Sequence, residues 1–104
     1  MKKIFKVFYI TFPSKKEAEK VAKSLLEKKL VFCVNIFKIN SMYWWEGKIE
    51  KSNEFALIAK TLKEKEKDVR KEVKRLHPYK VPFIGSFDVN VNEEYFDYAK
   101  KTLK

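Results

Sequence analysis

Apolar side chains follow two different periodicities at the start of this chain, one typical of a strand and the other of a helix. Residues Ile4–Phe12 are β-branched or aromatic with few interruptions and stop at Pro13, which predicts a buried strand. Ser14-Lys15-Lys16-Glu17 then has the form of a capping box, the usual start of a helix. Apolar residues follow at the helical spacing i, i+3, i+4, i+7 and i+8, namely Ala18, Val21, Ala22, Leu25 and Leu26.

The next stretch predicts two long strands joined by a tight turn. Leu30 to Trp45 is rich in β-branched and aromatic residues, Ile49 to Lys60 alternates apolar positions, and Glu46-Gly47 between them supplies the turn. Strands of up to ~14 residues would reach ~45 Å, whereas helices of ~13 residues cover only about 20 Å. We therefore expect the hairpin tip to overhang the helices and to form an arm at a subunit interface; a bent or bulged strand that folds back is the alternative. The tip carries Tyr43, Trp44 and Trp45.

The remaining residues predict a helix, a strand and a short final helix. Thr61-Leu62-Lys63-Glu64 resembles a second capping box, and Pro78 and Pro82 end the helix that it opens. Phe83–Val91 reads as a fourth strand, and Asn92 is expected to cap a last helix. One face of the second helix carries Leu62, Val69, Val73 and Leu76.

The order of these elements indicates the fold class. Strand, helix, strand, strand, helix and strand in succession form the ferredoxin-like split βαβ arrangement, an α+β sandwich with two helices on one face of an antiparallel sheet. An extra C-terminal helix and the long hairpin complete it. Because 104 residues suffice for one core but not for two, residues 1–104 are expected to form a single domain.

Charge changes this picture only slightly. The formal net charge is +10, and all of the 24 basic residues except Arg70 and Arg75 are lysines dispersed along the chain. Nucleic-acid binders usually cluster their charge and use the planar fork of arginine, so we expect a solvated surface and no nucleic-acid partner. No apolar run reaches the ~20 residues that span a membrane, and no export signal is evident, which favours the cytoplasm.

The chain offers few residues for chemistry. Its one cysteine, Cys33, lies within an apolar run and is expected to be a buried core residue in the middle of a strand. Its one histidine, His77, precedes Pro78 at a helix end, where a structural role and a ligand role are both open. No nucleophile–base pair, Cys-x-x-Cys or phosphate-binding glycine loop occurs, so we expect no enzyme.

Five segments, in this order and spacing, resemble the CutA divalent-cation tolerance family. The segments are Thr11-Phe12-Pro13, Leu30–Asn35, Tyr43–Lys48, Lys60-Thr61 and His77–Pro82. The resemblance implies a ferredoxin-like core assembled as a homotrimer akin to the nitrogen-signalling PII proteins, linked to tolerance of copper and other divalent metals, with no reaction implied. The motifs make four residues candidates for a ligand cleft or subunit interface: Trp45, Glu46, Lys60 and Tyr79.

The resemblance also bears on metal binding. Copper ligation in a bacterial relative is assigned to a cysteine before the Thr-x-Pro motif and to a His-His pair before Pro-Tyr. This chain has Ile10 at the first position and Leu76-His77 at the pair, so His77 alone matches a ligand. We therefore predict weak, His77-dependent binding of about one Cu(II) per subunit, with no cofactor needed for folding, because a tight protein site takes about four ligands.

Two other functions remain open at this level. A small-molecule sensor resembling PII would use clefts between subunits. An RNA-binding domain on the same fold would stack bases on strand aromatics, but the glycine-aromatic ribonucleoprotein pattern is missing from the strand Lys48–Lys60. The leading hypothesis is a non-enzymatic, trimeric protein of metal tolerance.

Overall fold

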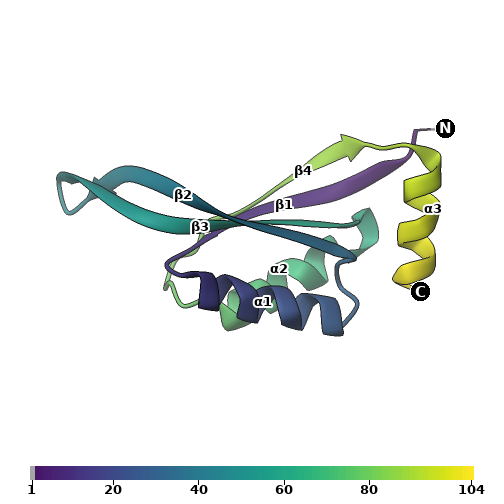
Figure 1. Ribbon diagram of the computed structural model, residues 1–104, viewed down its shortest axis with the longest axis horizontal. Coiled ribbons are helices and arrows are strands. Elements are labelled where there is room, and N and C mark those ends of the chain that lie inside the picture. The colour runs from purple at the N-terminus through teal and green to yellow at the C-terminus, as the bar shows by residue number, and fades with distance from the viewer. Residues whose placement is uncertain (1) are drawn as a thin grey trace.

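The computed structural model describes residues 2–104, which form a four-stranded antiparallel sheet and three α-helices. The strand order in the sheet is β2-β3-β1-β4, and each neighbouring pair is antiparallel (Figure 1). This is the predicted α+β class and element order. The elements are β1 (Ile4–Phe12), α1 (Lys15–Glu27), β2 (Cys33–Trp45), β3 (Lys48–Leu62), a 3-10 turn (Lys63–Lys65), α2 (Glu66–Leu76), β4 (Ile84–Asn90) and α3 (Glu93–Thr102).

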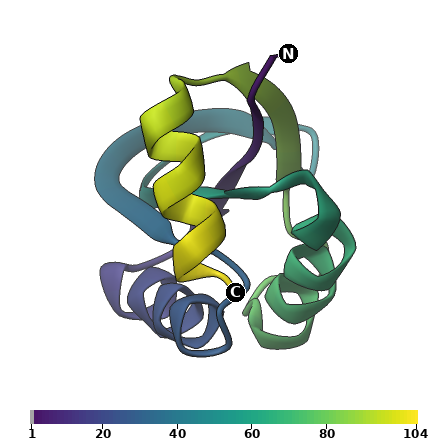
Figure 2. The same cartoon turned by 90° about the vertical axis from the view of Figure 1, so that its right-hand side faces the viewer.

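The main core lies between the sheet and two of the helices. Helices α1 and α2 lie side by side on one face of the sheet (Figures 1 and 2). Alternation along the strands turns Phe8, Ile10 and Leu57 toward this face, where the side chains are fully buried. The helices meet them with the apolar stripe that the sequence predicts, which includes Val21, Leu25, Val69 and Val73. A smaller cluster under α3, at one end of the sheet, contains Phe5, Phe32, Leu62, Ala99 and Leu103.

Helix α1 has well-defined ends. The Ser14 side chain accepts a hydrogen bond from the Glu17 backbone N–H at 3.2 Å, as the capping motif predicts. At the other end, the Leu30 N–H donates to the Leu25 carbonyl and the Lys29 N–H to the Leu26 carbonyl, the pattern of a Schellman motif. Lys29 takes the left-handed position of this motif, with φ of 56°.

Four local predictions differ from the structure. Thr61 does not cap a helix: it is still in β3, and its hydroxyl donates to the Leu30 carbonyl at 2.6 Å, so α2 begins only at Glu66, after the 3-10 turn. Leu62 consequently belongs to the cluster under α3 and not to the face of α2. Cys33 is the first residue of β2 and only half-buried, because it lies opposite Lys60 on the face of the sheet away from α1 and α2, at the edge of the cluster under α3. Asn92 does precede α3, but its side chain forms no capping hydrogen bond.

A buried carboxylate joins α1 to α2. Glu72 accepts hydrogen bonds from the Ser24 hydroxyl on α1 and from two nitrogens of Arg75, and Lys28 lies 3.0 Å away. These donors, led by Arg75, hold the pKa of Glu72 well below its usual range. The ionised carboxylate is therefore part of the packing between the two helices.

The long hairpin protrudes from this body, as predicted. Pairing of β1 with β3 ends at Phe12 and Phe55, so residues 39–54, here called the arm, form a ribbon of two strands only. Glu46 and Gly47 close it with φ of 48° and 78°, the sign that a type I′ turn requires at both positions. Trp44 and Trp45 are 73% and 61% exposed at its tip, which extends beyond the helices (Figure 1).

The second face of the sheet is largely uncovered. By strand alternation this face, here called the open face, presents Tyr9, Phe37, Ile58 and Phe87, and α3 covers only the end beside Phe5. Phe37 and Phe87 are about half exposed. Trp45 points to the same side of the ribbon as Phe37, because the two residues are an even number of positions apart on β2. No helix in residues 2–104 is long and apolar enough to cross a membrane.

Candidate functional site

His77 lies at the C-terminal end of α2, where the chain turns away before Pro78 and brings the imidazole onto the end of β1. The ring stacks on the buried Phe12 ring with centroids 4.4 Å apart. Its Nδ1 accepts a hydrogen bond from the Tyr79 backbone N–H at 3.1 Å, so its Nε2 carries the proton and donates to the Thr11 carbonyl at 2.7 Å. The His77 ring thus bonds a carbonyl of β1, and only the backbone N–H of His77 bonds a terminal carbonyl of α2, that of Val73.

These contacts define the charge state of His77. The side chain is only 9% exposed, and burial lowers its pKa despite the Thr11 carbonyl and the nearby Glu17 and Glu54. The neutral ring matches the hydrogen-bond pattern, since a protonated ring would present a second N–H to the Tyr79 N–H. Both nitrogens of the one candidate ligand are therefore occupied by protein groups.

The donor set around His77 does not form a tight metal site. A ligating imidazole needs a free lone pair, and the Nδ1 lone pair accepts the Tyr79 N–H. Cys33 lies far from the His77 ring: it pairs with Lys60 of β3, which pairs with Val7 of β1, and Val7 is roughly 17 Å from Phe12 at the rise of a strand. Within residues 2–104, no three His, Cys, Asp or Glu side chains lie close enough together to hold a metal.

Tyr79 connects this corner of the body to the arm. Its hydroxyl donates to Glu54 Oε2 at 2.6 Å, and its ring lies 5.0 Å from the His77 ring. Burial, and then the Glu54 carboxylate, raise the pKa of Tyr79 far above its ordinary value, so the phenol keeps its proton. Glu54 was not a candidate from the sequence, because no motif marks it and its partner is 25 positions away.

The structure does not gather the four cleft candidates into one site of a single chain. Trp45 and Glu46 lie at the arm tip, whereas Lys60 lies in the body. The segment of β3 from Lys48 to Lys60 spans about 40 Å at the rise of a strand. These residues can share a site only across two chains.

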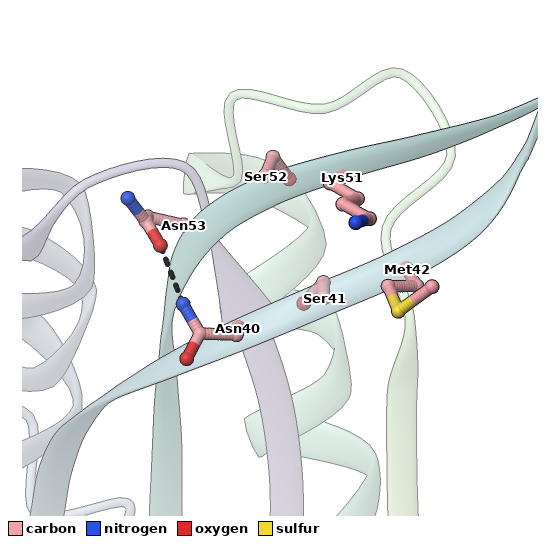
Figure 3. A pocket seen from close by; sticks show the side chains of 6 residues that line it. All are labelled: Asn40, Ser41, Met42, Lys51, Ser52 and Asn53. Atoms are coloured by element: carbon pink, nitrogen blue, oxygen red, sulfur yellow. Dashed lines mark hydrogen bonds between the residues drawn. The ribbon is translucent and has the colours of Figure 1, made fainter.

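Two shallow hollows lie near the candidate residues. One, of about 370 Å³, follows the middle of the arm, where the Asn40 side chain donates to the Asn53 side chain across the ribbon at 2.6 Å (Figure 3). The other, of about 250 Å³, lies between the open face and α3 and includes Lys60, Val7 and Tyr95. Within residues 2–104, no hydrogen bond joins a hydroxyl to an amine in either hollow, as an activated nucleophile would require.

Comparison with known proteins gives a consistent result. Residues 6–102 match the family model described as CutA1 divalent ion tolerance protein. Divalent-cation tolerance protein CutA of Archaeoglobus fulgidus is 52% identical over 97 residues, which cover 92% of this chain and 95% of that protein. The corresponding protein of Thermococcus kodakarensis is 44% identical over 98 residues, with 93% and 94% covered.

Solved structures agree with this match. The chain superimposes with a TM-score of 0.92 on the periplasmic divalent cation tolerance protein CutA from Archaeoglobus fulgidus, at 50% identity and with 96% of this chain and 99% of the other covered. CutA1 from Pyrococcus horikoshii gives a TM-score of 0.91 at 40% identity, with 95% and 98% covered.

Proposed function

The chain belongs to the CutA1 divalent ion tolerance family, and on this premise we propose that it acts in divalent-cation tolerance as a non-enzymatic closed trimer that binds metal only weakly. The observation that carries the proposal is the arm together with the open face. Both expose large aromatic side chains that a chain working alone would be expected to cover.

Self-association explains these exposed groups. A two-stranded ribbon is marginally stable in water and offers unpaired backbone groups along both edges. A neighbouring copy can cover the aromatics of the arm and add strands to its edges. In a closed ring the arm and the open face of every copy are covered equally, whereas an open arrangement would continue to add copies and form fibres. The +10 charge of each chain keeps such an assembly soluble.

The absence of catalysis is part of the proposal. The only histidine is held neutral between two backbone groups, and within residues 2–104 no hydrogen bond joins a nucleophile to a base in either hollow. We also place the protein in the cytoplasm, the compartment favoured by its sequence; the Archaeoglobus relative of known structure is described as periplasmic.

Cu(II) is expected to bind weakly and only through His77. Coordination by Nδ1 has to displace the Tyr79 N–H, which leaves that donor unpaired at a cost of about 1–3 kcal/mol, or roughly 5- to 150-fold in affinity. Titration calorimetry of wild type should therefore show weak binding of about one ion per chain, and His77→Gln should remove it. Glutamine keeps an N–H that can donate to the Thr11 carbonyl, so the substitution tests the ligand with the least disturbance of the fold.

Two results would contradict this account of metal binding. One is tight Cu(II) binding that persists in His77→Gln. The other is unfolding of the wild-type protein when a chelator removes all metal, because a structural metal contributes directly to folding.

A further inference from the structure

The arm leaves the body with little to define its direction. Beyond Phe12 and Phe55 no other strand of residues 2–104 accompanies it, so its two strands pair only with each other. In residues 2–104, one side-chain hydrogen bond joins the arm to the rest of the chain, the bond from the Tyr79 hydroxyl to Glu54, and no ion pair does so. The loop that carries Tyr79, between α2 and β4, lies toward the arm's side of the body (Figure 1).

Tyr79 is itself held firmly by the body. Its backbone N–H donates to His77 Nδ1, and the His77 ring is fixed by stacking on Phe12 and by its bond to the Thr11 carbonyl. A continuous set of contacts therefore runs from the end of β1 through two side chains to the base of the arm. A short bond between a hydroxyl and an ionised carboxylate is about twice as strong as one between neutral groups.

We infer that Tyr79 is a positioning residue, which through Glu54 sets the direction of the arm and so prepares it to engage a second copy of this chain. This inference rests on the proposed self-association. Glu54 and Gly47 are seven positions apart, or about 23 Å at the rise of a strand, so a tilt of ~10° at the base displaces the tip by about 4 Å. Such a shift takes the tip tryptophans out of register with any complementary surface.

Fixing the arm before association lowers the cost of association. An arm that moves freely has to lose its orientational freedom when it binds a second copy. An arm held by the bond between Tyr79 and Glu54 has lost that freedom already. The hydroxyl should consequently matter more for assembly than for the fold of the body. A substitution that removes this single oxygen separates the two effects.

The test compares Tyr79→Phe with wild type in two measurements. Sedimentation over a dilution series gives the protein concentration at half-assembly, and hydrogen–deuterium exchange with mass spectrometry follows residues 48–54 against residues 4–12 of β1. We expect at least a tenfold rise in the half-assembly concentration and faster exchange in residues 48–54, with β1 unchanged. Tyr98→Phe is the matched control, because the Tyr98 hydroxyl forms no hydrogen bond within residues 2–104.

A double-mutant cycle with Glu54→Gln completes the experiment. If the two groups act through their mutual bond, the double variant should resemble either single variant; fully additive effects would overturn the inference. So would a Tyr79→Phe variant that matches Tyr98→Phe in both measurements. A wild-type chain that never assembles would refute both the proposed trimer and the role of the Tyr79–Glu54 bond in assembly. Hydrogen–deuterium exchange in residues 48–54 would still report whether this bond holds the arm.

Discussion

Replacing Trp45 with alanine is expected to dissociate the assembly while leaving the fold of the single chain intact. The ring is 61% exposed in the chain and lies on the same side of the ribbon as Phe37 of the open face, so it contributes little to the core of its own subunit. Burial of such a ring against a neighbour is worth about 3 kcal/mol, or roughly a hundredfold in the affinity of each contact. Light scattering of the variant over a dilution series measures the loss.

Leu26→Ala provides the control for this substitution. Leu26 is 42% exposed on α1, on the helical side of the molecule and away from the arm and the open face. The Leu26→Ala variant should therefore assemble like the wild-type protein. A Trp45→Ala variant with wild-type mass and melting curve would show that the ring is peripheral to the interface.

Phe12→Ala is expected to destabilise the body by about 3–5 kcal/mol, the range for a large aromatic removed from a core. Phe12 is fully buried, lies at the last pair between β1 and β3, and supports the His77 ring. The cavity therefore opens where the body, the loop after α2 and the base of the arm meet. Denaturant unfolding followed by circular dichroism gives the change in free energy.

A conservative substitution of Phe12 shows whether the loss of stability comes from the lost apolar volume or from any change at this position. Phe12→Leu keeps most of the apolar volume and should cost less than about half as much. If Phe12→Ala unfolds at the wild-type denaturant concentration, the packing of this corner is not as the structure has it.

Much of the fold could be predicted from the sequence because the informative patterns are local. The periodicity of Ile4–Phe12 and of Ala18–Leu26 depends only on neighbouring residues and on which face they bury. The protruding arm followed from strand length compared with helix length, since no helix within residues 2–104 is long enough to cover strands of 13 and 15 residues.

What escaped prediction depends on partners distant in the sequence. The sequence around Thr61 resembles a helix cap, but the Thr61 hydroxyl donates a hydrogen bond to the Leu30 carbonyl, 31 positions away, and the residue stays in β3. His77 looks like a ligand until the Thr11 carbonyl, 66 positions away, and the Tyr79 N–H occupy its nitrogens. Glu54 belongs to no sequence motif. It can bond Tyr79, 25 positions away, because β1 ends at the neighbouring pair Phe12–Phe55.

The mass of the metal-free protein in solution tests the central claim most directly, because the proposed function depends on an assembly built by the arm and not by a metal. Light scattering of chelator-treated protein at micromolar concentration should give three times the 12.5 kDa of one chain. A mass of 12.5 kDa under these conditions would contradict the account.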